Sequence, residues 1–415
     1  MHQKKVPAIN RPQPKLLPAV ETVTVASAGG VLFSLIGVPM GWMLGALTFG
    51  LCWKAFLGRP LHLPRWIYNL ALTALSYSMG LSFTMDSLRS ITGQIHFLLL
   101  ATILMILFGM IAAAFVAKCS SISAESSVLG SIPGGVVQMV ELSREIRGAE
   151  PTVVAVMQMC RFLGVIFIVP FAVTHFLAGG AMSETDLRNI RETLPGNAGS
   201  TASFAMLLLL PISACLAGRL RVPTPWMIGP LVTTIVLVAG GWELPRPTTE
   251  TMNVTQILLG TGLALSFSVE LLREVIQILH WILMGVGLTL VLAAVLAYIL
   301  SLASSLDPVT AFLAVSPGGM AEMGATALTM GADVPTITAY HLFRLLFILL
   351  VCPYLLKVGF RLWMKRTERR ISGRNPESWE KRAGSYLMTL NLHKIFYVNF
   401  DIIPFARSNS AQPDV

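Results

Sequence analysis

The chain has 415 residues, of which 54% are hydrophobic and only 12% are charged. A soluble domain carries about 25% charged residues, and a single core cannot bury this much apolar surface. Much of the net charge of +9 lies near the two ends, beside apolar segments, as is typical of the cytoplasmic flanks of membrane helices. The composition excludes a soluble enzyme and predicts an all-α polytopic protein in the lipid bilayer, with no direct nucleic-acid partner.

Apolar segments of the length that a spanning helix needs, roughly 20 residues, recur along the chain. They are 18–36, 38–57, 66–84, 95–118, 124–144 and 151–175, then 201–218, 223–241, 251–269, 279–302, 308–330 and 334–357. The predicted organisation is a basic cytoplasmic N-terminus (1–17), a first membrane repeat (18–178), a linker (179–200), a second repeat (201–360) and a loosely ordered basic cytoplasmic tail (361–415).

The two halves of the chain match one another, which predicts an internal duplication. The clearest match is a Pro-Gly-Gly sequence followed by methionine. Matched pairs at an offset of 184, or of 183 further along, are Pro133-Gly134-Gly135 with Pro317-Gly318-Gly319, Met139 with Met323, Trp42-Met43 with Trp226-Met227, Gly45 with Gly229, Arg161 with Arg344, and Pro170 with Pro353.

The orientation of the second copy depends on the number of crossings per copy, because five crossings invert it and six do not. If the Pro-Gly-Gly segments do not cross, the loops carry nine Lys and Arg residues inside and four outside; six crossings give seven and six. The nine are Lys54, Arg59, Arg65, Lys118, Arg144, Arg147, Arg219, Arg221 and Arg273, and the four are Arg89, Arg188, Arg191 and Arg246. The positive-inside bias therefore favours inverted repeats with about ten spanning helices and two broken or re-entrant segments. A broken helix that does cross is the alternative.

Each Pro-Gly-Gly sequence interrupts an apolar segment, at 133–135 and at 317–319. Proline removes a backbone donor and glycine relaxes the helix, so the chain should unwind there. Backbone freed at membrane depth must be buried in protein or line a water-filled cavity. Paired interruptions in two repeats point to a transporter's central site, where half-helix N-termini offer N–H groups to an anion. A structural kink that allows close packing is the alternative.

Two arginines, Arg161 and Arg344, lie within apolar runs, and Gln158 and His341 precede them by three residues. Each pair therefore shares one helix face. Because an ionised side chain in the bilayer is costly, it usually faces a cavity or a partner. We predict that these four side chains and the two Pro-Gly-Gly segments form one central substrate-binding site. The alternative is that the arginines only snorkel or hold helix ends through carbonyl groups.

The third residue after each Gly-Gly pair completes the predicted site, as Gln138 in the first copy and Glu322 in the second. Glu322 could pair with an arginine, carry a proton or coordinate a cation. The sequence contains no HExxH, no P-loop, no GxSxG and no histidine cluster. We therefore predict no catalytic residue, no metal and no cofactor, and we do not expect an enzyme.

The two Pro-Gly-Gly blocks, each followed by Met, by Gly-Ala-Glu or Gly-Ala-Asp, and by an intramembrane Arg before Pro, resemble the AbrB family of bacterial membrane proteins. The resemblance covers residues 18–360, and 316–353 is its most specific part. It implies a duplicated domain similar to transporters built on inverted repeats with discontinuous helices. Labels carried by family members include ammonia monooxygenase and regulator of gene expression, but the sequence shows no metal site for an oxygenase.

The leading hypothesis is a secondary-transporter-like protein of the bacterial inner membrane, with both termini cytoplasmic. Its solute would be a small anionic or zwitterionic molecule that binds between the two Pro-Gly-Gly segments. The alternative is a membrane-embedded regulator or sensor that acts indirectly on gene expression through a cytoplasmic partner. A homodimer is the oligomer that such folds suggest.

Overall fold

The computed structural model describes residues 16–146, 148–177, 206–268, 270–271, 275–304, 306–356 and 358–359. Residues Met1–Leu349 form one compact unit, and Leu350–Val415 form another. The predicted linker (179–200) and tail (361–415) lie outside the described residues. Every regular element in the described part is a helix, which confirms the all-α prediction.

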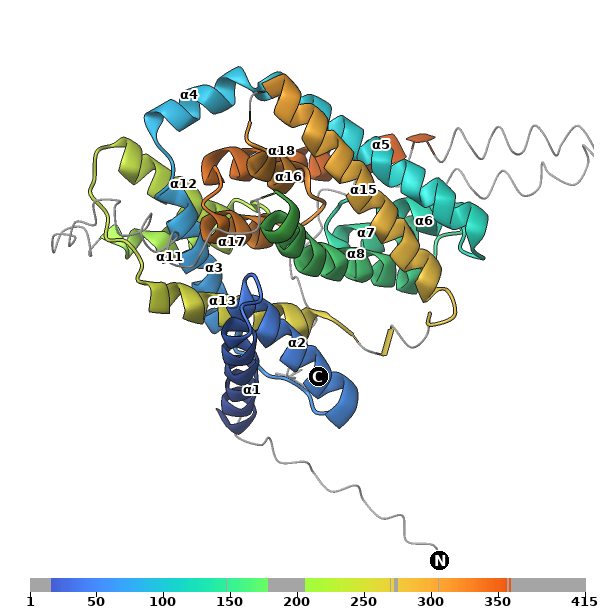
Figure 1. Cartoon of the computed structure of the whole chain (residues 1–415), viewed down its shortest axis with the longest axis horizontal. Coiled ribbons are helices and arrows are strands. Elements are labelled where there is room, and N and C mark those ends of the chain that lie inside the picture. The colour runs from blue at the N-terminus through green and yellow to red at the C-terminus, as the bar shows by residue number, and fades with distance from the viewer. Residues whose placement is uncertain are drawn as a thin grey trace, which may run out of the picture. The chain divides into compact units, whose positions relative to one another are not determined.

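The helices follow the predicted apolar segments closely (Figure 1). Only the short helix α4 was not predicted, and the helix predicted at 151–175 ends in a short π-helix, η1. The first half contains α1 (Leu16–Leu35), α2 (Gly41–Leu57), α3 (Arg65–Gly80), α4 (Met85–Gly93), α5 (Ile95–Cys119), α6 (Ala124–Ser131), α7 (Val136–Glu145), α8 (Pro151–Ala172) and η1 (Val173–Leu177). The second half contains α11 (Leu209–Arg219), α12 (Pro225–Ala239), α13 (Thr249–Ser266), α15 (Leu279–Ser304), α16 (Pro308–Val315), α17 (Met320–Met330) and α18 (Val334–Leu350).

Four helical stretches in the described part are long and apolar enough to cross a membrane: Pro18–Leu35, Ile95–Cys119, Pro151–Leu177 and Leu279–Ser304. Helices α2, α11, α12 and α18 are apolar but shorter. Large apolar side chains are exposed along α5 and α15, as expected for surfaces that face lipid. The chain is a polytopic membrane protein, and the number of its crossings stays a prediction.

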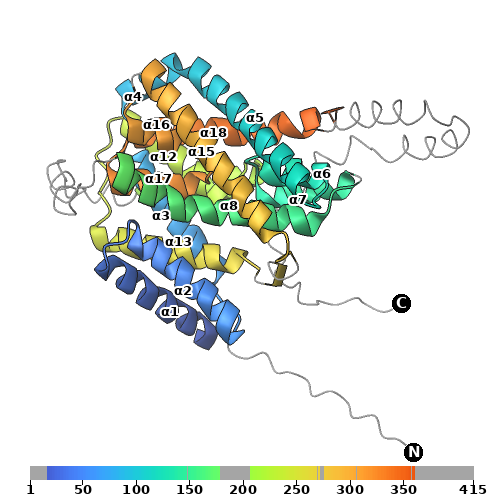
Figure 2. The same ribbon diagram turned by 45° about the vertical axis from the view of Figure 1, so that its right-hand side comes forward.

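The packing of the two halves is reciprocal. Helix α2 packs against α1 and α13, and its counterpart α12 packs against α11 and α3. Likewise, α5 packs on α6, α15 packs on α16, and α5 and α15 pack on each other. Figure 2 shows α1, α2 and α13 layered side by side. An internal duplication would produce these matched contacts, so they support that prediction.

Helices α5 and α15, which are counterparts in the predicted duplication, lie side by side and run in opposite directions (Figures 1 and 2). Helix α5 begins beside the end of α15 and ends beside its beginning. Inverted repeats place counterpart helices on a pseudo-two-fold axis antiparallel, whereas parallel repeats related by an axis along the membrane normal keep them parallel. The arrangement agrees with inversion, and the orientation in a membrane stays a prediction.

Glycine allows a close crossing of neighbouring helices in both halves. At the α1–α2 crossing, a Cβ added to Gly45 would overlap the carbonyl oxygen of Gly29. At the matching α11–α12 crossing, a Cβ on Gly229 would lie 2.7 Å from the carbonyl oxygen of Ser213. Small residues let helix backbones approach one another closely in membranes. The match between Gly45 and Gly229 therefore has a packing reason.

Candidate functional site

Both Pro-Gly-Gly segments interrupt a helix, as predicted. Residues 132–135 separate α6 from α7, and residues 316–319 separate α16 from α17. Neither segment continues the helical hydrogen-bond ladder, because proline has no N–H and disfavours the helical conformation of the residue before it. The prediction of two broken segments is confirmed, and whether they cross the membrane stays a prediction.

The two breaks have the same backbone geometry. The N–H of Gly134 donates to the carbonyl oxygen of Ile132, and the N–H of Gly318 donates to that of Ser316, both at 2.8 Å. A hydrogen bond between residues two positions apart closes a three-residue turn, here with proline at its centre. Each break is therefore an ordered turn.

The side chain at the start of each second half-helix folds back over the second glycine of the break. A Cβ on Gly135 would collide with the amide oxygen of Gln138, and a Cβ on Gly319 would collide with the carboxylate of Glu322. Gln138 and Glu322 occupy the third helical position, from which such side chains can cap the helix N-terminus. The helix N-termini are therefore covered, by an amide group in the first copy and by a carboxyl group in the second.

In the first copy, a buried glutamine and arginine of α8 hold the end of α6. The Gln158 amide nitrogen donates to the carbonyl oxygens of Leu129 at 2.7 Å and Ile132 at 3.0 Å. The Nη2 of Arg161 donates to the Gln158 amide oxygen at 2.8 Å and, more weakly, to the Gly134 carbonyl at 3.4 Å. Arg161 is only 5% exposed. The group satisfies carbonyls that the broken helix leaves without partners.

In the second copy, α18 supplies a histidine and an arginine that do the same for α16. The Nε2 of His341 lies 2.9 Å from the Leu313 carbonyl oxygen. Arg344 donates to the carbonyl oxygens of Ser316 at 2.7 Å and Gly318 at 2.6 Å, and to the Nδ1 of His341 at 2.8 Å. Since a guanidinium can only donate, Nδ1 must accept, which places the histidine proton on Nε2.

A further hydrogen bond recurs in both copies. In each, it joins a residue from the part matched at an offset of 184 to a residue from the part matched at an offset of 183. The N–H of Glu150 donates to the Ser126 hydroxyl at 2.8 Å, and the N–H of Asp333 donates to the Thr310 hydroxyl at 3.0 Å. It ties the start of the arginine-bearing helix to the first half-helix. These two hydroxyl groups were not among the predicted site residues, although Ser126 and Thr310 also match at an offset of 184.

The second break contacts the helix that carries the first arginine. A Cβ on Gly318 would lie 2.9 Å from Val165, and a Cβ on Gly319 would lie 3.4 Å from Phe162, both residues of α8. Arg344 is also near enough to Arg161 for their charges to interact. The predicted residues thus gather in neighbouring groups around α8.

An ion pair with an arginine was one of the roles considered for Glu322. Among the described residues, no ion pair joins Glu322 to Arg161 or Arg344. Glu322 lies over its own helix N-terminus instead, where the helix dipole favours an anion. Within the described part of the chain, no three His, Cys, Asp or Glu side chains gather in a way that could hold a metal ion.

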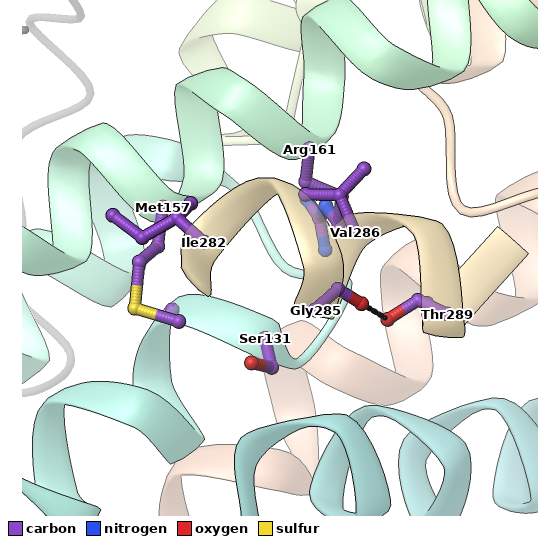
Figure 3. Close-up of a pocket in the computed structure, with 8 residues that line it drawn as sticks. Ser131, Met157, Arg161, Ile282, Gly285, Val286 and Thr289 are labelled. Atoms are coloured by element: carbon purple, nitrogen blue, oxygen red, sulfur yellow. Dashed lines mark hydrogen bonds between the residues drawn. The ribbon is translucent and has the colours of Figure 1, made fainter. Parts of the chain in front are cut away.

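A small cavity lies beside Arg161, between α6, α8 and α15. Figure 3 shows the Arg161 side chain extending from α8 toward α15, beside Val286. The volume of the cavity is about 10 Å³, close to the minimum for one water molecule. Its lining residues are Gly130, Ser131, Met157, Arg161, Ile282, Gly285, Val286 and Thr289. Apart from Arg161, the sequence analysis named none of them as site residues.

The fold and the site describe one class of protein, an all-α membrane protein with two matching broken helices held by buried arginines. The model of the family described as "Transition state regulatory protein AbrB" matches residues 42–359. The chain belongs to the AbrB family.

Two relatives are similar to most of the chain. "Uncharacterized protein YhjN" of Bacillus subtilis (strain 168) is 25% identical over 382 residues, which cover 84% of this chain and 95% of the relative. "Putative regulator AbrB" of Escherichia coli (strain K12) is 27% identical over 336 residues, which cover 77% of this chain and 90% of the relative. The name of one relative thus refers to regulation, and neither name refers to an enzyme.

Proposed function

We propose that the chain is a secondary-transporter-like protein of the bacterial inner membrane, which moves a small anionic or zwitterionic solute through a site near the two Pro-Gly-Gly breaks. The observation that carries the proposal is the pair of broken helices, each held by buried polar side chains inside an apolar fold. Irregular backbone at membrane depth is tolerated where it is buried in protein or lines a cavity, and transporters use such paired interruptions for binding.

The charge of the groups around the breaks supports an anionic or zwitterionic solute. Arg161 and Arg344 are buried there, and the one predicted acid, Glu322, already lies over a helix N-terminus. A buried positive charge without an ion-pair partner favours a ligand that brings a negative one. Cytoplasmic termini and a homodimer belong to the same proposal.

Flux measurements on the full chain, reconstituted in liposomes, test the proposal. Small carboxylates and amino acids are applied in turn, and solute-dependent uptake or current is recorded with empty liposomes as the background. We expect flux for at least one solute, and we expect Arg161→Gln to lower it at least about tenfold, because the substitution removes a charged hydrogen-bond donor. A folded protein without flux for any small anion or zwitterion would contradict the proposal.

The second candidate is a membrane-embedded regulator, which the name of the E. coli relative favours. It requires a cytoplasmic partner, and the basic tail is the docking surface that the sequence offers. Deletion of residues 371–415 separates the two candidates. Transcript levels in the deletion strain are compared with those in a strain that lacks the gene. A regulator that uses the tail should behave like the null strain after the deletion, whereas a transporter should keep its flux.

A further inference from the structure

We propose that Arg161, but not its counterpart Arg344, is the anion-contacting residue of the chain, and that the cavity beside it receives a single small anionic group. This group would be either the carboxylate of the solute or a lone halide ion. The inference rests on the proposed function for its role in transport, but it concerns binding and is tested by binding.

The first observation is that most of the donors of Arg161 have no partner. A guanidinium carries five N–H groups, one on Nε and two on each Nη. Both hydrogen bonds of Arg161 use Nη2, and among the described residues nothing accepts from Nε or Nη1, although both atoms are buried. Three N–H groups of a side chain that is 5% exposed therefore have no partner among the described residues.

Arg161 keeps these donors because of the residue three positions before it. That residue is Gln158 in the first copy, and His341 takes its place before Arg344 in the second. The amide nitrogen of Gln158 has two hydrogens and satisfies two carbonyl oxygens by itself. Neutral His341 has only one N–H and satisfies one carbonyl, so Arg344 must supply the donor for Ser316. Gln158 thus donates to the Ile132 carbonyl in the first copy, whereas Arg344 donates to the matching Ser316 carbonyl in the second.

The second observation is that the first break lacks a negative charge. Neutral Gln138 lies over the first break where Glu322 lies over the second. No acidic side chain lines the cavity beside Arg161, and no described acid forms an ion pair with it. The difference at 138 leaves the first break without an acidic neighbour, and the difference at 158 leaves donors of Arg161 without partners.

The cavity sets the size of the ligand. Besides Arg161, its polar side chains are Ser131, at the end of α6, and Thr289 of α15 (Figure 3). Its volume of about 10 Å³ holds about one water molecule, so only a compact group can enter without separation of α8 from α15. Chloride is therefore the single-atom probe. Formate, the smallest carboxylate, tests whether α8 and α15 separate to admit a larger anion, and gluconate is the oversized control.

Thermal unfolding of the purified full chain in detergent tests the inference, with tryptophan fluorescence as the readout. Chloride or formate replaces gluconate at constant ionic strength. We expect one of them to raise the unfolding midpoint saturably. Gln158→His keeps every charge but should tie Arg161 to the Ile132 carbonyl. We therefore expect its apparent affinity for the anion to fall at least about tenfold, and we expect the same of Arg161→Gln.

Gln94→His is the matched control, because it makes the same substitution between α4 and α5, away from the cavity, and should respond like the unmodified chain. A response to chloride alone identifies a halide site, and a response to formate identifies a carboxylate site. No saturable shift, or an equal shift in Gln158→His, would overturn the inference. Saturable binding without flux in liposomes would contradict the proposed transport but leave the inference standing.

Discussion

The two broken helices have the same backbone turn but different side-chain chemistry. In the second copy, Arg344 makes three hydrogen bonds of 2.8 Å or less and holds two carbonyls of the break. In the first, Arg161 makes one hydrogen bond of that length and leaves Nε and Nη1 without partners among the described residues. A duplication can therefore tie one arginine to the backbone of its break and leave donors of the other without partners.

The largest difference between the copies should appear when the arginines are removed. Arg344→Gln removes the charged donor from the buried carbonyls of Ser316 and Gly318, and Ser316 keeps only the N–H of Gly318, so we expect the fold to lose about 3–5 kcal/mol. Arg161→Gln loses one strong hydrogen bond but also removes an uncompensated buried charge, so we expect about 1–2 kcal/mol or less. Unfolding of the purified variants in detergent measures both. Equal losses, or a larger loss for Arg161→Gln, would contradict the distinction between the two arginines.

The helix crossings offer a second comparison. A methyl group at Gly45 meets backbone atoms of Gly29 that cannot rotate away, so Gly45→Ala should destabilise by about 2–3 kcal/mol. The clearance at Gly229 is larger, and Gly229→Ala should cost about 1–2 kcal/mol. The same unfolding assay compares them. A smaller loss for Gly45→Ala would show that the α1–α2 crossing is looser than described.

A third difference lies at the ends of α3 and α13. The ammonium group of Lys54 donates to carbonyl oxygens at the end of α13, those of Ala264 at 3.2 Å, Leu265 at 3.4 Å and Phe267. The first copy closes the matching end of α3 with backbone turns, because Val238 stands where a second lysine would be.

Lys54→Met should therefore destabilise the chain by about 1–2 kcal/mol, since it removes the cap of α13 while it keeps the length of the side chain. In the Lys54→Met variant, hydrogen exchange should show that α13 opens faster than α3. Val238→Met is the matched control and should change little. Equal exchange in α13 with and without Lys54 would contradict a capping role.

The smallest change in stability should come from a substitution of His341, which occupies in the second copy the position of Gln158 in the first. His341→Gln supplies a second N–H for the Ser316 carbonyl and relieves Arg344, so we expect a change within about 1 kcal/mol. His341→Ala leaves the buried Leu313 carbonyl without its donor and should lose about 2 kcal/mol or more. The two variants are compared by unfolding midpoint. A loss with glutamine as large as that with alanine would show that glutamine cannot replace the histidine.

Much of the fold could be predicted from the sequence, because apolar runs and Pro-Gly-Gly sequences act locally. The helix bounds and both breaks follow from those patterns. Pro133 and Pro317 mark the carbonyls of Leu129 and Leu313 as lacking a helical donor. Which side chains reach the carbonyls of each break could not be predicted, because that depends on how α8 and α18 pack. Spacing placed Gln158 beside Arg161, but only the contacts show that the glutamine decides how many donors the arginine keeps.

The role of Glu322 shows a second limit. An acid in an apolar segment suggested an ion pair, a proton carrier or a cation ligand. Its position three residues after Gly319 also fits a helix cap, and the side chain lies over that glycine. Local geometry here prevails over the attraction of a distant arginine.

Inversion of the two copies underlies the proposed transport, and cysteine labelling from each side of the membrane tests it most directly. Single cysteines are placed at Ser131, Val315, Asn189 and Thr248 in a cysteine-less background. We expect Asn189 and Thr248 to react only from outside. Ser131 and Val315, which directly precede the two breaks, should react from opposite sides. Reaction of Asn189 only from inside would show parallel copies and contradict inversion, and the regulatory candidate would then take precedence.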